Sequence, residues 1–102
     1  MNDPRQMRTE YERSVRSLLD TAARMKALGA EPEAIARTVH AERRLLASRF
    51  KDLTPEPLRS ALYNRTLEIY GDPAGPTIEY LRSKGKSWED IIESASRPGL
   101  LP

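Results

Sequence analysis

Apolar residues recur every three or four positions through the first quarter of the chain. The recurring positions are Met7, Tyr11, Val15, Leu18, Ala22 and Met25. This spacing puts them on one side of a helix and leaves the charged residues between them on the other side. The pattern predicts one amphipathic helix that begins near Asp3 and Pro4 and ends at Gly29.

Proline and glycine set the bounds of the next two predicted helices. The second begins at Pro32, where proline is tolerated because the first helical N–H has no partner, and runs to about Lys51. The third follows Thr54, which we expect to be its N-cap, and continues to Gly71. Residues 72–76 contain two prolines and a glycine, which predicts a loop.

Two short helices are predicted after this loop. One is "TIEYLRSK", which starts after Pro76 and ends at Gly85. The other is "WEDIIESAS", which starts after Ser87 and has Asp90 in the position that completes a capping box. The chain is therefore expected to be all-α, a small bundle of about five helices in a single domain over residues 1–102, with residues 1–24 as an N-terminal helix.

Composition narrows the class of protein. The 102 residues are 38% hydrophobic and 31% charged, which is typical of a small soluble domain with a limited core. No stretch approaches the length of an apolar membrane span or the pattern of an export signal, so a cytoplasmic protein that does not enter membranes is expected. With no Cys and a single His, we predict no metal site and no cofactor. The net charge of +2 is too small to identify a polyanionic partner by itself.

Two segments of the chain resemble each other. "MKALGAEPEAIA" from Met25 and "LRSKGKSWEDII" from Leu81 both have a glycine between two helical patterns, so each predicts a helix–Gly-turn–helix hairpin. In DNA-binding proteins of this type the second helix enters the major groove. Here that helix carries acidic residues, which repel phosphate, so a plain hairpin is favoured and DNA binding is kept as an alternative. The acidic residues in the second copy are Glu89, Asp90 and Glu93.

The helix over residues 32–51 has one apolar and one basic side. Its apolar residues are Ile35, Val39, Leu46, Phe50 and Leu53, and its basic side carries Arg37, His40, Arg44 and Lys51. Cations attract phosphate, and they lower the pKa of a neighbouring imidazole toward a usable neutral base. We therefore interpret His40 as a general base or acid, with Arg44 and Lys51 stabilising charge on an attacked phosphate. The competing interpretation is an ordinary solvated face.

A second group combines basic and aromatic residues. Its members, with Arg37 from the basic side, are Tyr70, Lys84, Lys86 and Trp88. Lysines hold phosphates while aromatic rings stack on bases, so this group suits single-stranded RNA. The alternative is that Trp88 anchors the core, and Asp72 is expected to brace its turn rather than to act in catalysis.

The stretch "HAERRLLASRFKDLTPEPLRSALYNRTLEIYGDPAGPTIEYLRSKGKSWEDIIESASRPG" resembles a C-terminal module of bacterial polymorphic toxins, the variable tips of Rhs-type and contact-dependent inhibition proteins. The resemblance covers about residues 25–99, and its most specific pieces are "LTPEPLR" and "YGDPAGPTIEYLRSKGKSWEDIIESASRPG". It implies an effector that a larger secreted protein delivers into the cytoplasm of a target cell and that a cognate immunity protein neutralises. Such tips are often nucleases that attack RNA. The pattern supplies no catalytic residues to carry over, and this chain ends "RPGLLP" where the family continues with a further Gly and an Asp-Leu-Gly ending.

These observations predict a metal-independent ribonuclease acting on RNA, provided that the basic side with His40 shares a hollow with Lys84 or Lys86. Two alternatives stay open. One is a non-catalytic interaction module that binds an immunity protein or a second copy of itself as a homodimer, with Leu100 and Leu101 of the apolar tail extending that contact. The other is the helix-turn-helix DNA-binding protein.

Overall fold

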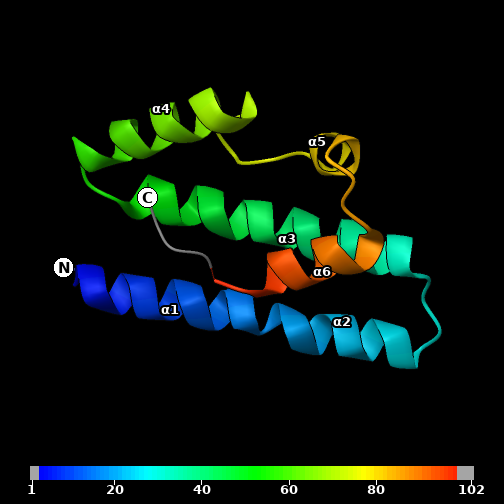
Figure 1. Ribbon diagram of the computed structural model, residues 1–102. Helices are drawn as coiled ribbons and strands as arrows, with labels where there is room; N and C mark the ends of the chain where they lie inside the picture. Colours follow the sequence, from blue (N-terminus) through cyan, green and yellow to red (C-terminus); the bar gives the residue numbers. More distant parts are fainter. Residues whose placement is uncertain (1–2, 99–102) are drawn as a thin grey trace.

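The computed structural model describes residues 3–98, and its regular structure in that range consists of helices alone (Figure 1). The helices are α1 (Pro4–Arg16), α2 (Leu18–Ala27), α3 (Pro32–Leu53), α4 (Leu58–Tyr70), α5 (Ile78–Ser83) and α6 (Trp88–Ser96). This confirms the predicted all-α bundle. The long α3 is central: α1, α2 and α6 pack against it, and α4 lies along it as a separate layer (Figure 1).

The predicted N-terminal helix is interrupted at Ser17, so the bundle has six helical segments in the described range. The Ser17 hydroxyl donates to the Ser14 carbonyl at 2.6 Å, a local bond that competes with the helical pattern. The Ser17 N–H still reaches the Arg13 carbonyl at 3.0 Å. As a result α1 and α2 follow each other along nearly one line (Figure 1), and the apolar stripe continues from one to the other.

The core is small and lies where α3 meets the N-terminal helices and α6. Its buried apolar residues include Val15, Leu18, Val39, Ile91 and Ala95. The apolar side of α3 enters this core at Ile35 and Val39, as expected, whereas Leu53 at its far end is 54% exposed. The apolar side of α3 is therefore buried near the start of the helix and exposed at its end.

Thr54 is not the N-cap of α4, which corrects the sequence prediction. Its hydroxyl instead donates back to the Phe50 carbonyl at 2.8 Å and closes α3, which ends at Leu53 rather than near Lys51. α4 begins only at Leu58, after Pro57. Because the Glu56 carboxylate accepts the Ser60 N–H at 3.0 Å, it satisfies one of the free donors at the start of α4.

The other boundary signals are confirmed. Gly71 ends α4 in the left-handed region at φ 72°, with its N–H bonded to the Leu67 carbonyl at 2.8 Å. Ser87 and Asp90 form both bonds of the capping box at the start of α6. Glycine turns join α2 to α3 and α5 to α6, as the two hairpins require.

Two further sequence expectations concern the C-terminal tail and the absence of a membrane span. The apolar tail with Leu100 and Leu101, expected to extend a contact with a second copy, lies outside the described residues. Within those residues, no helix has the length and apolar character needed to cross a membrane.

Candidate functional site

The basic side of α3 faces the loop over residues 71–77, which runs between α4 and α5. His40 is 7% exposed and Lys51 is 8% exposed. Both side chains bind main-chain carbonyls of this loop. The interpretation of this side as an open, solvated face is therefore wrong for these two residues, because the loop covers them. Arg37, nearer the start of α3, stays exposed and pairs with Glu33 at 2.9 Å.

His40 is held in one orientation by this loop. Its Nε2 lies 2.8 Å from the Pro76 carbonyl oxygen. A carbonyl only accepts, so Nε2 carries the proton and Nδ1 is left as the basic nitrogen of the neutral ring. Burial lowers the pKa of His40, and the positive charges of Arg44 and Arg43 lower it further, against the raising effects of the Pro76 bond and Glu79. The ring is therefore neutral at pH 7.

The Nδ1 atom of His40 receives no hydrogen bond from a described residue, and the bond of the ring to Pro76 is made by Nε2. Among the described residues, no side-chain nitrogen or oxygen is fully buried without a partner. Nδ1 is therefore at least partly exposed, although His40 as a whole is only 7% exposed.

Arg44 fastens the loop to α3 from the next turn of the helix. Its Nη1 donates to the Gly75 and Pro76 carbonyls, each at 3.2 Å, and its Nη2 donates to Asp72 Oδ2 at 3.0 Å. The other Asp72 oxygen accepts the Ala74 N–H at 2.8 Å. The bond from the Ala74 N–H is the largest cause that lowers the pKa of the Asp72 carboxyl, and the bond from Arg44 is the next largest. Asp72 braces its turn, as expected from the sequence.

Lys51 ties three parts of the chain together. Its Nζ donates to the Pro73 carbonyl at 2.9 Å and to the Thr66 hydroxyl of α4 at 3.2 Å, and it lies 5.7 Å from the centre of the Tyr63 ring. Burial lowers the pKa of Lys51, while the Asp72 carboxylate raises it. The position of the ammonium group fits a role in holding the loop and α4 on α3.

Two hollows open beside His40 and Arg44. The first, which we call the His40 hollow, has a volume of about 600 Å³ between α3 and the start of α5. It is lined by Arg37, His40, Ala41, Arg44, Leu45, Ser48, Ala74, Thr77, Ile78 and Glu79. The second has a volume of about 290 Å³, and it adds Lys51 and Tyr70 to His40 and Arg44. The volume of the His40 hollow is within the range of small-molecule sites in proteins.

Of the predicted nucleic-acid-binding residues, only Arg37 lines the His40 hollow, and the other four, Tyr70, Lys84, Lys86 and Trp88, lie outside its lining. The Arg82 guanidinium is 4.1 Å and the Arg37 guanidinium 5.3 Å from the centre of the Trp88 ring. Lys84 is 5.5 Å from the Tyr80 ring, which meets Tyr70 edge-on at 5.6 Å. Lys84 and Lys86 are exposed and line neither hollow, so the hollow shared with His40, on which the sequence made the ribonuclease prediction depend, is not formed. Of the predicted residues, Arg37 is the one that both lines the His40 hollow and contacts Trp88.

The sequence did not reveal the polar residues of α5 and its cap that complete the His40 hollow. Thr77 accepts the Tyr80 N–H at 3.0 Å as the N-cap of α5, and Glu79 follows in its first turn. The only sequence signal for them was the start of a short helix. Within the described part of the chain, no group of three His, Cys, Asp or Glu residues is arranged to hold a metal ion.

Comparison of the chain with protein-family models, with curated proteins and with solved structures gives no match. The assignment of a function therefore rests on the residues of this chain and on their geometry.

Proposed function

We propose that this protein is a toxin-type domain that binds and cleaves RNA at the His40 hollow without a metal ion. One observation supports the proposal: a neutral imidazole of fixed orientation, with Nδ1 unbonded to described residues, stands beside Arg44 at the wall of a hollow of about 600 Å³. A perturbed titratable group in a hollow is the usual mark of a functional site. The resemblance to polymorphic toxin modules supports the same class of activity.

The proposed reaction uses the 2′-hydroxyl of RNA as the nucleophile. His40 Nδ1 takes the proton of the 2′-hydroxyl, a bond forms from O2′ to phosphorus, and the bond from phosphorus to O5′ breaks. The leaving 5′-oxygen takes a proton from water, and the products are a 2′,3′-cyclic phosphate and a 5′-hydroxyl. The imidazolium then releases its proton to solvent. Arg44 and the exposed Arg37 provide positive charge next to the phosphate as negative charge develops on it.

The deciding experiment compares the purified protein with a His40→Gln variant on single-stranded RNA in the presence of a chelator. A glutamine amide still donates to the Pro76 carbonyl but has no basic nitrogen, so the fold is kept and the base is lost. We expect cleavage by the wild type and a loss of about 100- to 10,000-fold in the variant. Intact RNA at high wild-type concentration, or equal cleavage by the variant, would exclude the proposal.

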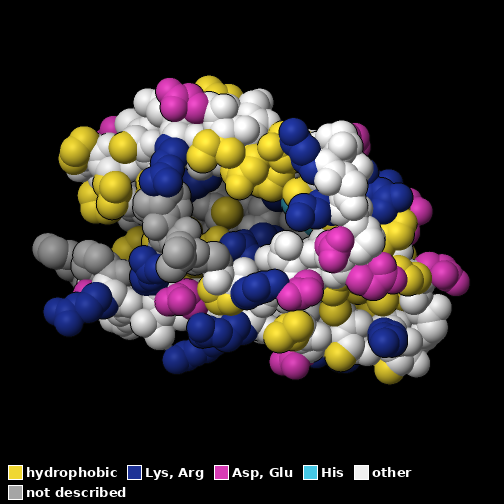
Figure 2. Space-filling model, viewed as in Figure 1, with side chains coloured by type: hydrophobic (Ala, Val, Ile, Leu, Met, Phe, Trp, Pro, Cys, Tyr) yellow, Lys and Arg dark blue, Asp and Glu magenta, His cyan; other side chains and the backbone are white. Residues whose placement is uncertain are grey.

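A second candidate function, a protein-interaction module, is supported by exposed apolar residues. Figure 2 shows hydrophobic side chains over α4. The exposed apolar residues of this helix include Leu58 at 54%, Leu67 at 47% and Ile69 at 53% exposure. An immunity protein is the partner that the toxin resemblance implies. Inducible expression in a bacterial host distinguishes the two functions, because a ribonuclease arrests growth and degrades RNA, whereas a docking module leaves both unchanged.

The DNA-binding alternative gains less support from the geometry. The helix that follows the glycine turn in the second hairpin is α6, and it carries exposed Glu89, Asp90 and Glu93. These carboxylates would face the phosphates of a bound duplex and repel them.

A further inference from the structure

The smaller of the two hollows beside His40 is lined by three cationic side chains of α3. It has a volume of about 290 Å³, and Arg43, Arg44 and Lys51 all belong to its lining. None of the described residues that line it is Asp or Glu. We call it the Arg43 hollow, because Arg43 lines it and does not line the His40 hollow.

Neutral oxygen atoms hold Arg43 in the wall of this hollow. Its Nε donates to the Tyr11 hydroxyl at 3.2 Å. Its Nη1 donates to three main-chain carbonyls at the end of α6, those of Ser94 at 3.3 Å, Ala95 at 3.0 Å and Arg97 at 2.9 Å. These bonds leave Nη2 without a partner among the described residues, and it has some exposed surface, since no described side-chain nitrogen is fully buried without a partner. Arg43 therefore has a fixed position and a donor left for a ligand.

The positive charge around the Arg43 hollow is only partly balanced. Arg44 pairs with the Asp72 carboxylate at 3.0 Å, whereas the ion pairs between described residues include neither Arg43 nor Lys51. With His40 neutral, three cations against one carboxylate leave an excess of two positive charges. Burial lowers the pKa of Lys51, which shows that water solvates its ammonium group poorly. Poorly solvated charges are stabilised by a counter-charge, so the hollow favours an anion.

The size of the charge excess indicates which anion fits. At pH 7 a phosphate monoester carries about −1.5 to −2 charges and has three acceptor oxygens. A carboxylate or a phosphodiester carries a single negative charge and offsets only half of the excess. Guanidinium groups donate to phosphate oxygens in a geometry that matches the phosphate group. The charge and the donors of the hollow therefore fit a phosphate group with two negative charges.

We propose that the Arg43 hollow is a binding site for a doubly charged phosphate group, either inorganic phosphate or the terminal phosphate of a nucleotide. Arg43 donates to it through Nη2, and Arg44 and Lys51 supply further positive charge. This inference goes beyond the proposed ribonuclease, because the internal phosphates of RNA are diesters and their cleavage is assigned to the His40 hollow. Binding at the Arg43 hollow does not require that RNA is cleaved.

Isothermal titration calorimetry at constant ionic strength tests the site with three probes: inorganic phosphate, adenosine 5′-monophosphate and adenosine. None of them has a phosphodiester bond, so the result is independent of the RNA cleavage assay. We expect both phosphate compounds to bind at one site per chain and adenosine not to bind. Equal affinities would identify inorganic phosphate as a sufficient ligand, and tighter binding of the monophosphate would identify a nucleotide end. A wild type that binds neither phosphate compound at millimolar concentration would overturn the proposal.

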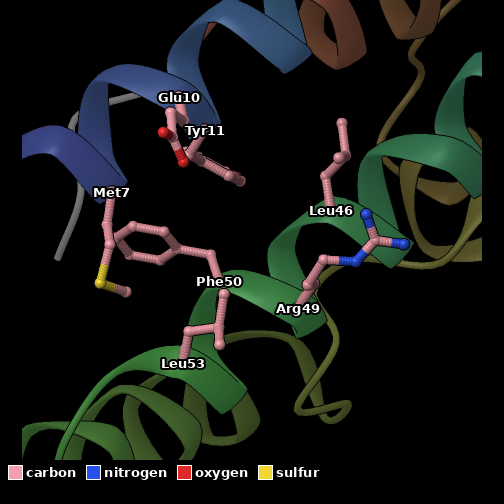
Figure 3. A pocket seen from close by; sticks show the side chains of 7 residues that line it. All are labelled: Met7, Glu10, Tyr11, Leu46, Arg49, Phe50 and Leu53. Carbon is pink, nitrogen blue, oxygen red and sulfur yellow. The ribbon is translucent and has the colours of Figure 1, made fainter. Parts of the chain in front are cut away.

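A matched pair of arginine variants locates the site. Arg43→Gln keeps an amide that can donate to the α6 carbonyls but removes the charge, and it should weaken phosphate binding by at least about tenfold. Arg49→Gln is the control, because Arg49 is an exposed arginine of the same helix and lines a separate hollow between α1 and α3, with Phe50 and Leu53 (Figure 3). This control should bind phosphate like the wild type. Equal weakening by the two variants would contradict the assignment.

Nuclear magnetic resonance of the wild type supplies a test that does not depend on the folding of Arg43→Gln. Addition of inorganic phosphate should shift the side-chain Nε–H signals of Arg43 and Arg44 and the backbone amide of Gly75, which all belong to the lining of the hollow. The amides of α2, which contributes no residue to this lining, should not shift. Shifts that leave Arg43 and Arg44 unchanged would place the bound phosphate elsewhere and overturn the proposal.

Discussion

The single histidine is the residue whose environment departs furthest from what its sequence context indicates. The sequence placed His40 among cations, and Arg44 and Arg43 do lower its pKa, but the largest cause is burial beneath the loop that carries Pro76. Nothing in the local sequence reveals this burial, because Pro76 is 36 residues away along the chain. The side of α3 that carries the site was predictable from helical periodicity, whereas the loop over residues 71–77 that covers this side was not.

The lowered pKa of His40 predicts a pH dependence of folding stability. The unfolded chain takes up a proton at an ordinary histidine pKa of about 6.5, whereas the folded state resists protonation of the buried ring. Stability contributed by the neutral ring is therefore present above that pH and is lost as the pH falls below it, with a slope of at most about 1.4 kcal/mol per pH unit. We expect urea unfolding to show a larger loss between pH 7.5 and 5.5 for the wild type than for His40→Gln. Equal losses would contradict the burial of the ring as the cause.

At the scale of the helices, the boundaries predicted correctly are those where the local residues fit only one structural role. Gly71 ends a helix because it adopts a positive φ at little cost, and the Ser87–Asp90 pair satisfies two donors within four residues. Thr54 was ambiguous, because its hydroxyl can accept from the helix that follows or donate to the helix that precedes. Ser17 was missed because the apolar stripe continues unbroken across it.

The capping box of α6 gives the element-scale prediction. Ser87→Ala removes the hydroxyl that accepts the Asp90 N–H at 3.0 Å, and this change should lower the free energy of unfolding by about 1 kcal/mol. The matched control is Ser94→Ala, an exposed serine inside the same helix, which should be neutral or slightly stabilising because alanine is the better helix former. Thermal or urea unfolding of the two variants measures the difference. If both alanine variants unfold like the wild type, the capping box does not stabilise α6.

At the scale of the whole molecule, the bundle has two parts of unequal packing. α3 packs against α1, α2 and α6, which share one core, while α4 packs mainly against α3 and buries only Leu62 and Thr66 among its described residues. Lys51 fastens this outer layer through its bonds to Thr66 and to the loop carbonyl of Pro73. Since the same loop goes on to bind His40 and Arg44, the outer layer and the cover of the His40 hollow are connected.

This difference in packing predicts that α4 opens before the rest of the bundle. Few buried apolar contacts lower the free energy of local opening, so backbone amides of α4 near Leu62 should exchange with solvent deuterium faster than those of α3 near Val39. Lys51→Met should accelerate exchange in α4 without changing it in α2, whereas Lys86→Met, at an exposed lysine, should change neither. Native-state hydrogen exchange at several low urea concentrations separates the two openings. If α4 and α3 exchange at one common free energy, the bundle opens only as a whole. If α4 opens alone, the loop that follows it is released with it, and the cover over His40 is lost without unfolding of the bundle.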